Sequence, residues 1–297
     1  MTEYTEHYLA TGALPQSKVL STPLAHVAPQ RRELLARKAA QLQAQATAPH
    51  RVHFAPGMEL TELGMQFDAI VVDPPWAEVA SGGEAVWTAQ DLARLDVNGI
   101  GAYPGVLLLW CGSGGTYDGV HSHFDEACDL LATWNYRLCE VLTWAKVQDV
   151  SERSSHGLVR RSKELCLVAL RDHVWRDTSG HFVHANVDTD VIVAPSTRGR
   201  VKPTAFYEVV ERFCLGRRRL DVFGSTTRDG WVTLDRLADA SCVFDAPSYE
   251  AELVKTAANP TTPCVLGVDN DIEMLRPKAP QRFAKGAKAK PKKTPIA

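Results

Sequence analysis

The feature that most limits how this chain can fold is a series of short, nearly continuous apolar runs after Pro49. The runs are rich in β-branched residues and lie at 67–73, 105–111, 137–147, 164–170, 190–194 and 219–224. Runs without polar alternation are typical of strands covered on both faces, as in parallel sheets. Helical patterns alternate with them at 89–95, 122–134 and 203–215. This alternation predicts an α/β domain around a mostly parallel sheet.

Segments of different composition flank this α/β region. Residues 1 to about 30 are polar and interrupted by prolines, and residues 31–46 carry leucine and alanine at helical spacing. After residue 245 the strand patterns fade, and from 259 onward Pro, Lys and Ala are frequent. We therefore predict an N-terminal arm and helix over 1–48, an α/β domain over 49–245, and a low-order C-terminal extension with a basic tail over 246–297.

Composition excludes several classes of protein. The seven cysteines form no CxxC pair, which predicts a reducing compartment and no metal site. No apolar run reaches the about 18 residues that a membrane-spanning helix needs, so we expect no membrane partner. Eight Lys and Arg and no acid follow residue 275, whereas the preceding residues carry 25 basic and 35 acidic side chains. A polyanion would therefore need a local basic patch or the tail.

The most informative short motif is Asp73-Pro74-Pro75-Trp76, at the carboxyl end of the predicted strand 67–73. Open α/β sheets bind ligands at that end. The prolines stiffen the segment, the Asp73 carboxylate and the Pro74 carbonyl can accept hydrogen bonds from an exocyclic amine, and Trp76 offers a face on which a base can stack. The motif fits methylation at N6 of adenine, where positioning does most of the work. The alternative is a rigid turn with a buried tryptophan.

Several segments together resemble the eukaryotic N6-adenosine methyltransferase family, whose signature is Asp-Pro-Pro-Trp after a strand, and within it the methyltransferase-like 14 type subunit. The similar segments are 4–16 (YTEHYLATGALPQ), 109–114 (LWCGSG), 134–140 (WNYRLCE), 161–167 (RSKELCL), 184–193 (HANVDTDVIV), 211–224 (ERFCLGRRRLDVFG) and 230–234 (GWVTL). The resemblance implies a Rossmann-like class I methyltransferase fold. It also implies a heterodimer with a catalytic methyltransferase-like 3 type subunit that methylates adenosine in messenger RNA.

Most contacts that catalytic members of this family make to S-adenosylmethionine are missing. The corresponding segments here are 53–56 (HFAP), 225–228 (STTR) and 235–236 (DR), none of which matches the catalytic pattern. Lys163 does match the lysine that approaches the donor's methionine carboxylate, where a point charge is suitable, but non-catalytic members carry it too. Losing several contacts of about 1–3 kcal/mol each would weaken donor binding by orders of magnitude. We therefore expect the complex to use S-adenosylmethionine and this chain not to bind it.

Three basic clusters are candidates for contact with RNA or with a partner subunit. They are Arg160 and Arg161 with Lys163, then Arg198, Arg200 and Lys202, and lastly Arg217, Arg218 and Arg219. In the resembled branch, the arginine matching Arg161 lies in a groove between the subunits that contacts RNA. We predict that the first two clusters bind nucleic acid and that the third serves the partner interface, the alternative being solvated charge. The basic tail would add salt-dependent affinity, and its segment KAKPKK predicts a nuclear location.

These observations leave three functional hypotheses. The leading one is a pseudo-enzyme that stabilises a catalytic partner and helps to bind RNA. The second is an active S-adenosylmethionine-dependent adenine-N6 methyltransferase acting on RNA or DNA, in which Asp73 and Pro74 orient N6, Trp76 stacks on the base and Lys163 holds the donor. The third is a nucleic-acid-binding module with no methyltransferase partner, which rests on the basic clusters alone.

Overall fold

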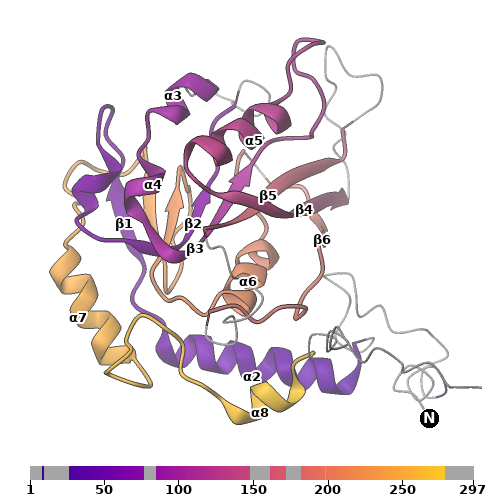
Figure 1. Ribbon diagram of the computed structural model, residues 1–297, viewed down its shortest axis with the longest axis vertical. Coiled ribbons are helices and arrows are strands. Elements are labelled where there is room, and N and C mark those ends of the chain that lie inside the picture. Colours follow the sequence, from indigo (N-terminus) through magenta and orange to yellow (C-terminus); the bar gives the residue numbers. More distant parts are fainter. Residues whose placement is uncertain are drawn as a thin grey trace, which may run out of the picture.

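The computed structural model of the chain describes Leu9 and residues 27–76, 85–147, 161–171, 182–197 and 199–277. An eight-stranded sheet forms its centre, in the order β1-β8-β7-β2-β3-β5-β4-β6 (Figure 1). The strands are β1 His50–His53, β2 Phe67–Val72, β3 Gly101–Trp110, β4 Arg137–Val147, β5 Lys163–Arg171, β6 Val191–Pro195, β7 Arg219–Val222 and β8 Val232–Asp235. Neighbouring strands are parallel except at β5, which runs antiparallel to β3 and β4. The predicted mostly parallel sheet is confirmed.

Helices cover both faces of this sheet (Figure 1). One face is covered by the 3-10 helix η2 Leu60–Leu63 together with α3 Ala89–Ala93, α4 Val97–Ile100 and α5 His123–Thr133, and the other by α6 Thr204–Phe213. The long helix α2 Pro29–Gln45 lies beside α8 Asn270–Leu275 at the lower edge of the view. The helical patterns at 31–46, 89–95, 122–134 and 203–215 therefore each contain a helix.

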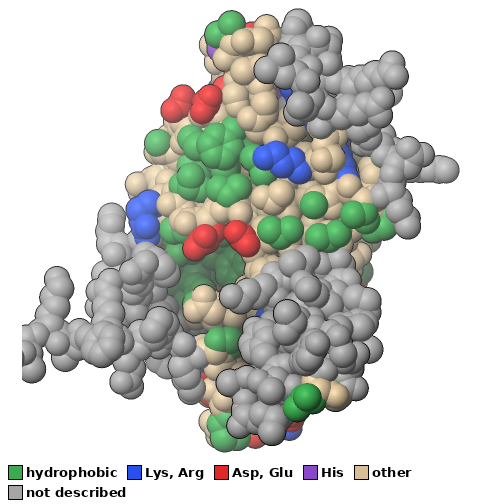
Figure 2. Space-filling view, turned by 90° about the vertical axis from the view of Figure 1, so that its right-hand side faces the viewer, with side chains coloured by type: hydrophobic (Ala, Val, Ile, Leu, Met, Phe, Trp, Pro, Cys, Tyr) green, Lys and Arg blue, Asp and Glu red, His purple; other side chains and the backbone are tan. Residues whose placement is uncertain are grey.

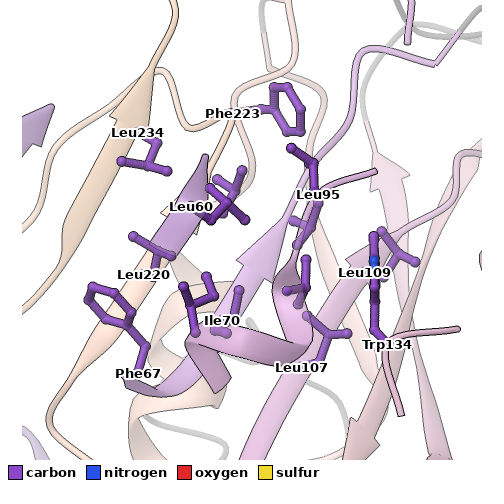
Figure 3. Close-up of a cluster of buried hydrophobic side chains, with 14 of the residues drawn as sticks. Leu60, Phe67, Ile70, Leu95, Leu107, Leu109, Trp134, Leu220, Phe223 and Leu234 are labelled. Carbon is purple, nitrogen blue, oxygen red and sulfur yellow. The ribbon is translucent and has the colours of Figure 1, made fainter. Parts of the chain in front are cut away.

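The two apolar layers explain why the strand sequences lack polar alternation. In β2 and β3, Ile70 and Leu107 point into the layer under α3, α4 and α5, whereas Val71 and Leu108 point into the layer under α6. Figure 3 shows side chains of the first layer converging from several strands and helices. Because successive residues face opposite sides of a strand, a strand that is buried on both sides must be apolar at every position.

The C-terminal region differs from the low-order extension that we predicted from residue 246. Residues 246–256 form α7 (Ala246–Thr256), in which Tyr249 and Leu253, one helical turn apart, are completely buried. Tyr249 packs edge-on against His50 at 5.2 Å between ring centroids, and α8 follows at 270–275. Two buried residues suffice to dock a helix that is otherwise mostly exposed, and such a sparse pattern is easily missed in a sequence. The rest of the extension, 278–297, and most of the predicted arm lie outside the described residues.

The described part of the chain has neither a membrane-spanning helix nor a cluster of metal ligands. No helix there is long and apolar enough to cross a bilayer. Within the same ranges, no three His, Cys, Asp or Glu side chains are grouped so that they could hold a metal ion. All seven cysteines are free thiols.

Candidate functional site

The motif that begins at Asp73 lies where the direction of strand addition reverses. Along the chain, β2 is followed by β3 on one side, and β7 and β8 later return on its other side. In open α/β sheets, ligands bind at the carboxyl ends of the strands at such a point. Asp73 directly follows β2, and its backbone N–H donates to the Val222 carbonyl at the end of β7, at 3.1 Å. The motif is thus at the expected ligand position of the fold.

The Asp73 carboxylate is buried and already paired with two cations. Asp73 is only 5% exposed. Lys202 Nζ lies 3.0 Å from Oδ1 and Arg200 Nη1 lies 3.5 Å from Oδ2. Arg200 Nη1 also donates to the backbone carbonyl of Asp73 at 2.6 Å and to that of Phe223, just after β7, at 3.5 Å. The guanidinium therefore spans the crevice between β2 and β7, where a ligand would otherwise approach.

Lys202 connects Asp73 to a second carboxylate. Its ammonium lies 3.0 Å from Glu164 Oε2 on β5, and Lys146 Nζ on β4 lies 2.6 Å from Glu164 Oε1. The ammonium of Lys202 also sits 4.9 Å from the ring centroid of Trp110, at the end of β3. The resulting chain of alternating charges, which we call the Lys202 network, comprises Asp73, Lys202, Glu164 and Lys146 with Arg200 beside them.

The charges of the Lys202 network maintain one another against the cost of burial. Burial raises the pKa of Asp73 even though Lys202 and Arg200 act in the opposite direction. Burial would also raise the pKa of Glu164, but Lys202 and Lys146 outweigh it and lower that pKa. Burial would lower the pKa of Lys202, but Asp73 and Glu164 outweigh it and raise that pKa. Each charged form thus depends on its neighbours.

Trp76 is also occupied by contacts within the chain. It is 1% exposed, and its Nε1 donates to the Trp110 carbonyl at 2.7 Å. The His123 imidazole stacks on its ring at 4.6 Å between centroids, and Tyr117 stacks on His123 at 4.2 Å. Glu126 accepts from the Tyr117 hydroxyl and binds His123 Nδ1, both at 2.8 Å. An imidazole therefore covers a face of Trp76 on which we predicted a base to stack.

The carbonyl groups of the two prolines have partners as well. The Trp76 N–H donates to the Pro74 carbonyl at 2.8 Å, and the Trp87 N–H donates to the Pro75 carbonyl at 3.1 Å. The arrangement matches our alternative interpretation of the motif, a rigid turn with a buried tryptophan. The carboxylate, the ring and the carbonyls that would present adenine are all used internally.

Three residues at the donor positions, Phe54, Asp235 and Arg228, do not fit S-adenosylmethionine. Phe54, after β1, is buried against Phe223 at 5.2 Å between ring centroids. Asp235, at the end of β8, is paired with Arg51, and the Arg228 guanidinium lies 3.4 Å above the Tyr207 ring. A donor needs free hydrogen-bonding groups for its ribose, adenine and methionine ends, since unpaired polar groups cost affinity. These side chains are committed to other contacts and do not provide such groups.

Of the predicted nucleic-acid-binding residues that the structure describes, Arg200 and Lys202 do not share a surface with Arg161. Arg200 and Lys202 point inward to the Lys202 network, and Lys202 is only 5% exposed. Arg161 is partly buried and donates from Nη2 to the Thr116 carbonyl at 2.5 Å, while Lys163, the predicted donor contact, is exposed at the start of β5. Arg160 and Arg198 lie outside the described residues. The predictions for Arg161 and Lys163 remain open.

Two arginines of the predicted partner interface, Arg217 and Arg218, bind groups of their own chain, and the third, Arg219, is buried. Arg217 is 2% exposed and donates to the backbone carbonyls of Gln45 at 2.6 Å and Leu253 at 2.9 Å. Arg218 donates to the Asp68 carboxylate from Nε at 3.0 Å, and Arg219 is 4% exposed. Arg217 and Arg218 thus tie α2, α7 and β2 to the start of β7.

The members of the Lys202 network on β4 and β5 were missed by the sequence analysis. Lys146 stands near the end of the run 137–147, and Glu164 is the first residue of the run 164–170. A charge that is part of such a strand is rarely buried without a partner. Such charges are the signal that could have identified them as a pair. The stacking partner of Trp76, His123, has no comparable signal in its surroundings.

A second buried carboxylate lies behind the site. Asp221 on β7 is 1% exposed, accepts from the Tyr207 hydroxyl at 2.8 Å through Oδ2, and has no hydrogen-bond partner at Oδ1. Burial raises the pKa of Asp221 to about 7. The folded chain therefore holds this proton more tightly than the unfolded chain does.

Comparison with known proteins adds a family match to this geometry. A profile of the MT-A70 family matches residues 67–236, which include the motif and most of the sheet. The chain is 34% identical over 296 residues to the N(6)-adenosine-methyltransferase non-catalytic subunit METTL14 of Xenopus tropicalis, covering 94% of this chain and 62% of that protein.

Relatives from a fly and a plant are similar to this chain as well. The identity to the protein of the same name in Drosophila melanogaster is 32% over 303 residues, covering 94% of this chain and 72% of that protein. The identity to the N6-adenosine-methyltransferase non-catalytic subunit MTB of Arabidopsis thaliana is 34% over 212 residues, covering 65% of this chain and 26% of that protein. The chain spans only part of these relatives, 62% of the frog protein's length.

The first prediction concerns the central ammonium of the Lys202 network. Lys202→Met should lower the free energy of unfolding by about 3–5 kcal/mol, because it leaves two buried carboxylates without their shared cation. Adding Asp73→Asn should recover part of the loss. Lys163→Met, which removes an exposed lysine near the same strand ends, should change stability by less than about 0.5 kcal/mol. Urea unfolding measures all three, and equal effects of the two lysine substitutions would contradict the network.

The second prediction concerns the pH dependence of stability. Because the pKa of Asp221 is about 7 in the folded chain and about 4 in an unfolded one, its contribution is greatest below pH 4 and falls as pH rises towards 7. Between pH 4 and 7 the free energy of unfolding should fall by about 1.4 kcal/mol per pH unit because of Asp221, and Asp221→Asn should remove this fall. Urea unfolding of both proteins from pH 5 to 8 measures it. A stability difference that stays constant over this range would refute the assignment.

Proposed function

Because this chain belongs to the MT-A70 family, we propose that it is the non-catalytic subunit of an adenine-N6 methyltransferase heterodimer that acts on RNA. The observation that carries the proposal is the internal engagement of the motif: Asp73 binds Lys202 and Arg200, and Trp76 stacks with His123. A working site would need these groups for the substrate. The relatives named as non-catalytic subunits add support.

The partner in this proposal is a catalytic subunit of the methyltransferase-like 3 type, which would bind S-adenosylmethionine and carry out the transfer. This chain would stabilise that subunit and complete the surface that binds RNA. Figure 2 shows hydrophobic side chains gathered in patches on one face of the molecule, with few basic groups among those that are coloured. Exposed apolar patches of this kind are suited to burial against another protein.

Two peripheral features complete the proposal. Arg161, held at the Thr116 carbonyl, is the described arginine that we assign to RNA. The basic tail would strengthen RNA binding without sequence preference, and its KAKPKK segment would direct the chain to the nucleus. Exclusion of a fluorescent fusion of the full chain from the nucleus would contradict this location.

An active methyltransferase remains the competing function, and one observation favours it: the sequence keeps Asp73-Pro74-Pro75-Trp76 intact. For this enzyme to work, Arg200 would have to leave the crevice between β2 and β7, and Trp76 would have to lose His123. The two functions differ in whether the chain binds S-adenosylmethionine.

The third prediction distinguishes these functions. Calorimetric titration of S-adenosylmethionine into the full chain should give no binding heat, because the donor positions are engaged elsewhere. In a complex reconstituted with a catalytic subunit, Asp73→Asn in this chain should leave methyl transfer within about twofold of the parent, a change of under 0.5 kcal/mol in the barrier.

Asp129→Asn, on the exposed side of α5, is the matched control for Asp73→Asn. Micromolar donor binding, or loss of methyl transfer with Asp73→Asn alone in a complex that assembles as the parent does, would favour the active enzyme. Failure of the chain to raise a catalytic subunit's activity or substrate binding would contradict the subunit role.

The fourth prediction concerns RNA. Arg161→Gln in the reconstituted complex should weaken binding of single-stranded RNA and lower the slope of log affinity against log salt by about one, as expected for one lost phosphate contact. Arg137→Gln is the control, because Arg137 is exposed at the opposite end of β4. Filter binding at several salt concentrations measures both. Equal slopes in both variants would show that Arg161 does not contact phosphate.

A further inference from the structure

Helix α2 buries a lysine that has no partner. Lys38 is 0% exposed, and its Nζ makes no hydrogen bond. It lies on the inward face of the helix together with Leu34 and Gln45. An ammonium group that leaves water without gaining a partner is costly to bury. The position therefore calls for a compensating negative group.

A second buried cation, Arg219 at the start of β7, also has unused donors. It is 4% exposed, and its Nε and Nη2 lack hydrogen-bond partners. These two nitrogens form one edge of the guanidinium, from which two parallel N–H groups point the same way. That edge is the fork that binds carboxylate or phosphate oxygens in pairs. The unused part of Arg219 is thus its oxyanion-binding edge.

The two cations lie close enough to repel each other. Burial, together with the Arg219 charge and against the opposing effect of Glu273, lowers the pKa of Lys38 to about 8. At pH 7 the ammonium form still predominates at such a pKa. Glu273 is the carboxylate that acts on Lys38, but it already binds His184 Nε2 at 2.9 Å and Arg276 Nε at 2.6 Å.

Cys214, which also interacts with Lys38 and Arg219, does not supply a negative charge. Burial raises the pKa of its thiol to about 12, so the sulfur is neutral at physiological pH. His184 Nδ1 is also buried without a partner, but it is not a further donor, because Nε2 binds Glu273 and Nδ1 of the neutral ring is then an acceptor. Among the described residues, this region beneath α2 has an excess of positive charge and of unused donors.

Solvent reaches the neighbouring turn of α2 through a groove of about 600 Å³ between α2 and α8, lined by Arg37, Gln41, Gly267 and Asn270 among others. Gln41 lies close to one turn beyond Lys38, and its Oε1 is buried without a partner. Lys38 and Arg219 are not among the lining residues of this groove, so a small solute would have to pass the turn that carries Gln41 to reach the buried cations.

We propose that the chain binds a small oxyanion of the phosphate class beneath α2, held by the Nε and Nη2 of Arg219 and by the Nζ of Lys38. A tetrahedral oxyanion offers two oxygens to the arginine fork and a further oxygen to the ammonium. A carboxylate has only two oxygens, and chloride cannot use the spacing of the fork. The bound ion would neutralise both cations and connect α2 to the central sheet.

The fifth prediction tests this site on the full 297-residue chain. Inorganic phosphate should give saturable binding heat at pH 7, and it should raise the midpoint of thermal unfolding more than sodium chloride of equal ionic strength does. Lys38→Met should weaken phosphate binding at least about tenfold, the effect of losing one charge-assisted hydrogen bond. Without phosphate, the same variant should be at least as stable as the parent, because an unpaired buried ammonium is gone.

Lys255→Met, on the exposed side of α7, is the control for the change of charge and should respond to phosphate as the parent does. Arg219→Lys keeps the charge but removes the fork, so it should also lose the response to phosphate. This variant tests the site if Lys38→Met does not fold. Equal stabilisation by phosphate and chloride in the parent would overturn the site. An equal response to acetate would overturn its assignment to phosphate.

Discussion

The buried ammonium of Lys202 is the interaction on which the rest of the site depends. It joins the carboxylate after β2 to the carboxylate on β5, and it lies against the ring of Trp110 at the end of β3. Three strand ends are thereby tied to the segment that leads into α6. None of these charges is stable alone in such a buried place, so the contacts of the motif are set by charge balance and leave little freedom for a substrate.

The sheet could be predicted from the sequence largely because its central strands are buried on both faces. The apolar runs located β2 to β7 closely, and a resemblance to a methyltransferase family supplied the fold. The short strands β1 and β8, which lie next to each other at one side of the sheet, were missed, since four residues that include His, Arg, Thr and Asp carry too weak a pattern. The reversed direction of β5 was also not predictable, because a run that is apolar throughout looks the same in either direction.

The sequence predicted where the site lies in the fold, but not which residues contact one another in it. The position of Asp73 after a buried strand placed it at the ligand-binding edge, yet its cations come from about 127 residues away along the chain. In the sequence, Arg200 and Lys202 looked like part of a basic cluster for RNA. Only packing shows that they turn inward, because the same residue types serve a phosphate outside and a carboxylate inside.

The pairing of Asp73 with Lys202 also bears on how the chain can evolve. If Asp73 changed first, it would leave a buried ammonium short of a partner. If Lys202 changed first, each of two buried carboxylates would lose one of its two cations and keep only Arg200 or Lys146. Either single step passes through a less stable protein, so the pair resists gradual loss. Selection for folding alone would then preserve Asp73, the first residue of the motif, long after selection for methyl transfer had ended. In this chain, the need for charge balance around Lys202 explains the retained aspartate of Asp-Pro-Pro-Trp as well as catalysis would.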